Sequence, residues 1–289
     1  MANSEIIGAG QDTAHRAPKT NTITCGDCLE VMQAIPNNSV NMVLCDLPYG
    51  ITAPKWDSVL PIPTLWNEYK RILKKNSVMV FTSVQPFTTM LISSNLNEFK
   101  YCWYWIKNQG TNFFHAKRMP IRKVEDIVVF GGNRYYPQIT SGHIPTNSAK
   151  GCSNGKAYHG TNKRNYQGGK TTRFPVNILE IDCVDNYSRV HSSEKPVALF
   201  EYLIRTYTNE CDTVLDNCIG SGTTAIACIN TGRNYVGIEK EEKYCRIAEE
   251  RIHALKSPAQ NTMEICHTAP NSAMLQGLKP HAGNTGTSA

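Results

Sequence analysis

Four residues that follow a short apolar run could hold a flat nitrogenous ring. The run from Val40 to Cys45 predicts a buried strand, and Asp46-Leu47-Pro48-Tyr49 comes directly after it. Carbonyls beyond a strand end are unpaired, so the Asp46 carboxylate and the Leu47 carbonyl can both accept hydrogen bonds from one amino group. The aromatic ring of Tyr49 can cover the face of the bound ring. The segment therefore favours a ligand ring that carries an exocyclic amino group.

A second group of residues predicts a nucleoside site. Val214 to Asp216 reads as a strand, followed by a turn that contains Gly220, Ser221 and Gly222 and then by an apolar helical stretch. Glycines let the backbone approach a ligand, and a helix N-terminus offers N–H groups to an anion. A further strand, 234–238, ends in Glu239, which can accept hydrogen bonds from ribose hydroxyls. The glycine turn alone is a weak signal, because the third glycine of the dinucleotide fingerprint is absent, but the other two strand ends agree with it.

Together these segments resemble the motifs of amino-group-directed DNA methyltransferases. Asp46-Leu47-Pro48-Tyr49 resembles the family's Asp-Pro-Pro-Tyr, 216–224 resembles Asp-Pro-Phe-X-Gly-Ser-Gly-Thr-Thr, and 191–197 resembles His-Pro-Thr-X-Lys-Pro-Val. Their order, with the catalytic motif first, is similar to the circularly permuted β class. The chain departs from the pattern at Leu47, at Cys218, which replaces a phenylalanine beside the methionine moiety, and at Ser192, which replaces a proline.

The resemblance implies S-adenosylmethionine as the cofactor and assigns residues to it. Lys195 is expected to order its turn or to meet the cofactor carboxylate, and Asp27 is expected near the adenine of the cofactor. The implied catalytic residues are Asp46, Leu47, Pro48 and Tyr49, and the implied cofactor-binding residues are Asp27, Lys195, Asp216, Cys218, Gly220, Ser221, Gly222, Thr223 and Glu239.

The target implied by the resemblance is the N6 amino group of an adenine turned out of duplex DNA. Adenine enzymes of this type mostly carry Asp at the first motif position and cytosine-N4 enzymes mostly carry Ser, so Asp46 favours adenine. Cytosine N4 is the alternative, and RNA or protein substrates share the same geometry. A non-catalytic nucleic-acid-binding relative is the alternative from another class, but it would be expected to lose Asp46 or the glycine turn.

A basic segment predicts the nucleic-acid surface. Between 131 and 179 the chain has no acidic residue, and tyrosines are interleaved with its basic residues, whereas the alternative interpretation is a solvated loop. His115, Lys117 and Arg118 are weaker candidates for phosphate contact. Trp56 and Asp57 are weaker candidates for closing over the target base. The implied DNA-binding residues are Arg134, Lys150, Lys156, Lys163, Arg164, Lys170 and Arg173. Double-stranded DNA is the expected partner, with a homodimer and a cognate restriction endonuclease as further candidates.

The cysteines indicate free thiols. The chain has 11 cysteines, an odd number, and we read no secretory signal, so we expect a cytoplasmic protein of bacterial or phage origin. Cys25 and Cys28 form the one close pair. Four ligands are needed for a structural zinc, and no second pair has metal spacing, so we expect no metal.

The periodicity predicts an α/β fold with a Rossmann-like methyltransferase sheet, mostly parallel with an antiparallel strand, and an inserted target-recognition region. We expect a disordered tail over 1–20, a catalytic half over 21–132, the basic insertion over 133–190, a cofactor half over 191–256 and a disordered tail over 257–289. The expected strands are 22–25, 42–45, 78–82, 101–106, 127–130, 214–216 and 234–238, and the expected helices are 28–35, 65–74, 199–207, 225–229 and 243–255.

Overall fold

Eight strands form one sheet whose middle holds both predicted motif strands. The structure is a computed structural model that describes residues 18–51, 57–145, 168–185, 187, 189–190 and 193–256. The strand order is β1-β8-β7-β2-β3-β5-β4-β6. The strands are β1 (Thr22–Cys25), β2 (Val40–Cys45), β3 (Leu73–Ser83), β4 (Phe99–Thr111), β5 (Arg122–Gly131), β6 (Ile178–Glu180), β7 (Thr213–Asp216) and β8 (Asn234–Glu239).

The direction of the strands confirms the predicted sheet. Five adjacent strands are parallel to one another: β1, β8, β7, β2 and β3. The next strand, β5, runs antiparallel to both β3 and β4. β4 therefore points the same way as β3, and β6 is parallel to β4. The carboxyl ends of β1, β8, β7 and β2 lie along one edge of the sheet, which is where ligands bind in open α/β sheets.

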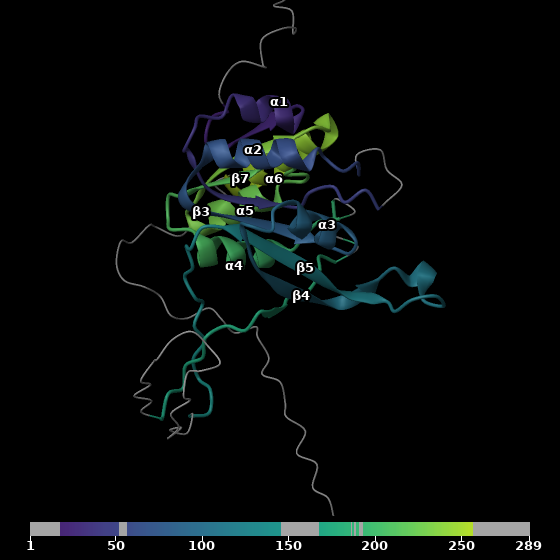
Figure 1. Cartoon of the computed structure of the whole chain (residues 1–289), viewed down its shortest axis with the longest axis vertical. Coiled ribbons are helices and arrows are strands. Elements are labelled where there is room, and N and C mark those ends of the chain that lie inside the picture. Colours follow the sequence, from purple (N-terminus) through teal and green to yellow (C-terminus); the bar gives the residue numbers. More distant parts are fainter. Residues whose placement is uncertain are drawn as a thin grey trace, which may run out of the picture. The chain divides into compact units, whose positions relative to one another are not determined.

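Helices cover both faces of this sheet (Figure 1). One face packs against α1 (Cys28–Gln33), α2 (Ile62–Ile72) and α3 (Phe87–Ser94). The other face packs against α4 (Val197–Tyr207), α5 (Thr223–Thr231) and α6 (Glu242–Lys256). Every residue of β2 is buried, as expected of a parallel strand covered on both faces.

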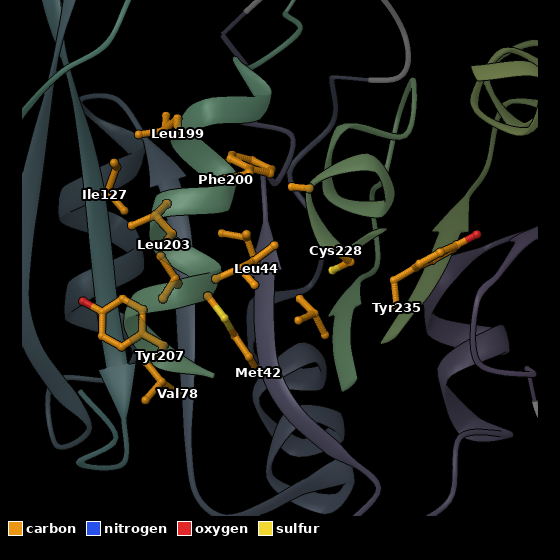
Figure 2. Close-up of a cluster of buried hydrophobic side chains, with 14 of the residues drawn as sticks. Met42, Leu44, Val78, Ile127, Leu199, Phe200, Leu203, Tyr207, Cys228 and Tyr235 are labelled. Carbon is orange, nitrogen blue, oxygen red and sulfur yellow. The ribbon is translucent and has the colours of Figure 1, made fainter. Parts of the chain in front are cut away.

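The α4 side of the core is built from apolar side chains that alternate along the strands. Met42 and Leu44 of β2 face α4, whereas Val43 and Cys45 belong to the cluster on the opposite face. Figure 2 shows the side chains of α4 lying among those of the sheet, with Leu199, Leu203 and Tyr207 from the helix and Met42, Leu44 and Val78 from the strands. This packing fixes the direction of β2 and so the position of Asp46 at its end.

The structure adds two elements that the periodicity did not predict, α3 and β6. It also corrects one boundary: helix α2 ends at Ile72, and the chain passes directly into β3, so Leu73 and Lys74 are not helical. The strands β4 and β5 are longer than expected and form an antiparallel hairpin that runs beyond the sheet (Figure 1). Its end holds a short 3-10 helix, η1 (Phe113–His115).

Contacts divide the chain into two units. The first unit contains the sheet, including β6, and its helices, and it also contains Arg134. The described residues of the second unit are 137–145 and 168–176. In this second unit Thr140 and Arg173 form an isolated antiparallel bridge. The described residues of this unit lie within the predicted insertion over 133–190, whose bounds stay a prediction. No helix within the described ranges is long and apolar enough to span a membrane.

Candidate functional site

Four acidic residues lie at the carboxyl edge of the sheet, one at or just beyond the end of each of the four neighbouring strands β1, β8, β7 and β2. Asp46 follows β2, Asp216 ends β7, Glu239 ends β8, and Asp27 comes two residues after β1. Because these strands are neighbours in the sheet, residues that are far apart in the sequence meet at one edge. The strand ends that the sequence singled out therefore form one site.

Asp46 accepts hydrogen bonds from three side chains. The hydroxyls of Tyr49 and Thr82 both donate to its Oδ1, and these two hydroxyl oxygens lie 3.2 Å apart. Lys195 Nζ donates to Oδ2 at 2.6 Å. The carboxylate is about one fifth exposed and so stays reachable from solvent. Its orientation is fixed from two directions before any ligand binds.

The turn after Asp46 is held by a buried acid. Asp57 accepts from the backbone N–H of Gly50 at 2.8 Å and of Ile51 at 2.9 Å, so it shapes the turn. The Leu47 side chain is buried in the core, which leaves its backbone as the part of the residue available to a ligand. The Tyr49 ring packs against Phe87 with 5.2 Å between ring centroids. Trp56 lies outside the described residues.

Lys195 makes a bond that its expected roles did not include. Its side chain donates to the Asp46 carboxylate, while its backbone carbonyl accepts from Thr223 Oγ1 of the glycine turn at 3.5 Å. Burial alone would lower the pKa of this ammonium, but the charges of Asp46 and Glu125 raise it above its usual value. Lys195 is therefore a charged residue that joins the two predicted halves of the site.

Two further residues, Glu125 and Lys107, extend the charged group behind Lys195. Lys107 Nζ donates to Glu125 Oε1 at 2.9 Å, and Glu125 Oε2 lies 3.7 Å from Lys195 Nζ. Burial would raise the pKa of Glu125, but the two lysines lower it, so this acid is ionised. Sequence reasoning missed Thr82, Glu125 and Lys107. A polar residue near the end of an apolar strand was the signal at Thr82, whereas the other two had no signal in the sequence.

The two glycines of the turn, Gly220 and Gly222, differ in the space that a side chain would have. Gly220 has φ +54°, and a Cβ built on it meets no atom within 4 Å. Gly222 has φ +88°, and its Cβ would lie 2.9 Å from Ala248 Cβ on α6. Gly222 is thus required by its positive φ and by helix packing, whereas Gly220 is favoured by its positive φ alone, and among the described residues the space beside it is open.

The acids beside this turn hold its backbone. Asp216 is buried and accepts from Cys218 N at 3.1 Å and from the Thr224 hydroxyl, and burial raises its pKa to about 7. Glu239 Oε2 accepts from Gly220 N at 2.8 Å, and burial raises its pKa as well. The acids therefore preform the turn.

The remaining predicted residues have structural contacts of their own. Asp27 caps α1 by accepting from Leu29 N at 3.0 Å, and it pairs with Lys240 at 3.2 Å. Ser221 Oγ accepts from Arg251 at 2.9 Å. Cys218 lies between Asp216 and Ile219 on the turn, and Thr223 begins α5.

Of the predicted DNA-binding residues, the structure describes three. Arg134 forms an ion pair with Asp212 at 2.8 Å. Arg173 donates to the carbonyls of Lys170 at 2.9 Å and Thr172 at 3.0 Å, so its guanidinium holds its own segment. The other four, Lys150, Lys156, Lys163 and Arg164, lie outside the described residues. Within the described ranges no group of three or more His, Cys, Asp or Glu side chains is arranged to hold a metal ion.

Comparison with known proteins places this site in a family. The chain is 27% identical over 277 residues to the type II methyltransferase M.HinfI of Haemophilus influenzae, covering 85% of this chain and 71% of that protein. It is 26% identical over 267 residues to the type II methyltransferase M1.MboII of Moraxella bovis, covering 80% of this chain and 95% of that protein.

Solved structures agree with the fold. The M1.HpyAVI–SAM complex matches with TM-score 0.53 at 22% identity, over 80% of this chain and 98% of that one. The cytosine-N4-specific PvuII DNA methyltransferase matches with TM-score 0.58 at 16% identity, over 86% and 91%. The family model of N6_N4_Mtase, described as DNA methylase, matches residues 40–250, which include Asp46, the glycine turn and Glu239. This chain belongs to the N6_N4_Mtase family of DNA methylases.

Proposed function

We propose that the chain transfers a methyl group from S-adenosylmethionine to the N6 amino group of adenine in duplex DNA. The observation that carries the proposal is the Asp46 carboxylate, held by three donors at the carboxyl edge of the sheet beside a preformed glycine turn. An amino group of adenine is a poor nucleophile because its lone pair is delocalised into the ring. Acceptors that take both of its N–H groups make it more tetrahedral and more reactive.

The residues around the turn fit S-adenosylmethionine. The open face of Gly220 admits a ligand close to the backbone, the first turn of α5 at Thr223 offers N–H groups to a carboxylate, and Glu239 lies where ribose hydroxyls can donate to it. The M1.HpyAVI structure was solved as a complex with this cofactor. When bound, the cofactor supplies an electrophilic methyl group on a sulfonium.

The protein residues then align and polarise the base. Asp46 and the Leu47 carbonyl accept the two N–H groups of the target amine, and Asp46 takes the proton that the nitrogen loses after transfer. The phenol of Tyr49 is fixed by its bond to Asp46, which sets the plane of its ring against the target base. Base-on-aromatic stacking of this kind contributes about 1–3 kcal/mol and replaces part of the stacking lost on flipping.

The choice of adenine over cytosine depends on Asp46. The resembled adenine enzymes mostly have Asp at this position, and cytosine-N4 methylation is the alternative, because the family includes both activities and PvuII methyltransferase is cytosine-N4-specific. We expect DNA to be held by the basic segment over 131–179 and by His115, Lys117 and Arg118 near the end of the β4–β5 hairpin. Self-association, a cognate endonuclease and a cytoplasmic location stay predictions.

The experiment combines a variant with analysis of the product. Purified protein is incubated with labelled S-adenosylmethionine and unmethylated DNA, and the digested nucleosides are separated by mass. We expect N6-methyladenine from the wild type and from the control Glu210→Ala, whose side chain is exposed and which precedes β7, at the end of that strand opposite to Asp216. Asp46→Ala should give no product and should bind the cofactor normally by calorimetry. N4-methylcytosine as the product would refute the adenine assignment, and lost cofactor affinity in Asp46→Ala would refute the role of Asp46.

A further inference from the structure

Glu125 carries a buried oxygen that lacks a hydrogen bond. Within the described part of the chain, no donor lies at hydrogen-bond distance from Glu125 Oε2. The other oxygen of the same carboxylate accepts from Lys107 at 2.9 Å. A buried acceptor without a hydrogen bond destabilises the folded protein, most of all on a charged group, so a native protein keeps one for a reason.

The ammonium of Lys195 lies near this oxygen without bonding to it. Its distance from Glu125 Oε2 is 3.7 Å, too long for a hydrogen bond, whereas its distance from Asp46 Oδ2 is 2.6 Å. The side chain of Lys195 is only 7% exposed, so water does not compete strongly for its protons. The ammonium thus lies between two carboxylates and is bonded to only one of them.

The bonded carboxylate is also the one that the target amino group needs. Asp46 Oδ1 already accepts from two hydroxyls, which use both of its lone pairs. The amino group must therefore bind Oδ2, where the ammonium is bonded now. A cation on this oxygen weakens it as an acceptor and as a base.

We propose that Glu125 is a positioning residue whose Oε2 accepts the Lys195 ammonium when the target amino group binds Asp46. The inference rests on the proposed function. The ammonium must move by about 1 Å to reach the usual length of a charge-assisted bond, which rotation of the lysine side chain provides. No proton passes between Lys195 and either carboxylate. Before the base arrives Lys195 orients Asp46, and afterwards Glu125 removes the competing charge.

The test is a double-mutant cycle on single-turnover methyl transfer. Glu125→Gln keeps the shape and an oxygen for Lys107 but removes the charge that attracts Lys195. We expect the rate of transfer to fall at least tenfold, with the Kd for S-adenosylmethionine unchanged. The control is Glu68→Gln, which breaks an ion pair with Arg71 on α2 and should leave the rate unchanged.

The second arm separates this role from a merely structural one. The Lys195→Met variant has no ammonium for Glu125 to accept. Adding Glu125→Gln to this variant should therefore change the rate less than twofold. The proposal would be overturned if the rate loss of the double variant equalled the product of the two single losses. A wild-type rate in folded Glu125→Gln would overturn it as well. If Glu125→Gln does not fold, Lys195→Arg decides: a guanidinium can bridge both carboxylates, so the rate should fall, and a wild-type rate would contradict the model. A wild-type protein that methylates no DNA would instead refute the proposed function.

Discussion

Replacing Thr82 by valine tests whether Asp46 is oriented in advance. Thr82 is fully buried in β3, and its hydroxyl donates to Asp46 Oδ1. Valine has nearly the same shape, so the change removes one hydrogen bond and creates no cavity. Tyr49 and Lys195 still donate to the carboxylate in the variant.

The size of the effect follows from the kind of bond removed. A hydrogen bond to a charged group contributes about 1.5–3 kcal/mol to stability. For a domain of this size, that loss corresponds to a fall in Tm of about 3–12 °C. If the same energy is lost in the transition state, the rate of methyl transfer falls about 10- to 150-fold, because 1.36 kcal/mol corresponds to tenfold.

The assays are thermal unfolding, single-turnover transfer and calorimetry with S-adenosylmethionine. We expect a lower Tm and a lower rate, but an unchanged cofactor affinity, because the side-chain partners of the Thr82 hydroxyl in the described part of the chain are Asp46 and Tyr49, neither of which belongs to the glycine turn. The control is Thr89→Val, an exposed threonine on α3 that bonds only to Gln85 among its side-chain partners in the structure. A variant of Thr82 with wild-type rate and Tm would show that the bond does not hold Asp46.

Three further predictions concern the rest of the site. Gly220→Ala should weaken cofactor binding in calorimetry and lower Tm only through the strain of its positive φ, whereas Gly222→Ala should lower Tm further because its Cβ also meets Ala248, and equal Tm losses would contradict this division. Because the folded-state pKa of Asp216 is raised to about 7, this acid makes wild-type stability fall as pH rises from about 4 to 7. Asp216→Asn should lack that loss, about 4 kcal/mol at 1.36 kcal/mol per pKa unit, and parallel pH profiles in denaturant titrations would argue against it. Lys170→Ala should weaken DNA binding equally across sequences and reduce its salt dependence, and an unchanged salt slope in fluorescence anisotropy would remove Lys170 from the DNA surface.

Much of the fold could be predicted because strand burial and helix periodicity are local properties of the sequence. β2 is buried throughout and apolar except at Asn41 since both of its faces are covered, and α4 repeats its apolar residues at helical spacing. α3 was missed because its polar residues Thr88, Ser93 and Ser94 interrupt the apolar pattern, and β6 because it has only three residues. Short elements of this kind depend on neighbours that the sequence does not show.

The site was predicted in part for a similar reason. Residues at strand ends, such as Asp46 and Glu239, are placed by their own strands. The sequence around each was therefore enough to predict its position at the edge of the sheet. The contacts of Lys195 and Glu125 depend on which strands are neighbours in the sheet, because the bonded pair Lys195 and Asp46 are 149 positions apart. The sequence therefore predicted that Lys195 orders its turn or meets the cofactor carboxylate, and it gave no sign of the bond from the Lys195 ammonium to Asp46.

The pairing of β2 with β7 joins segments from opposite ends of the chain. Each half on its own would expose the edge of a central apolar strand, and such edges aggregate unless they are covered. Expressed separately, residues 1–155 and 156–289, which together keep the whole basic segment, should therefore be insoluble. Expressed in the same cell, the two fragments should dock along this seam and restore a working split enzyme, whose assembly could be placed under the control of any pair of proteins fused to the cut ends.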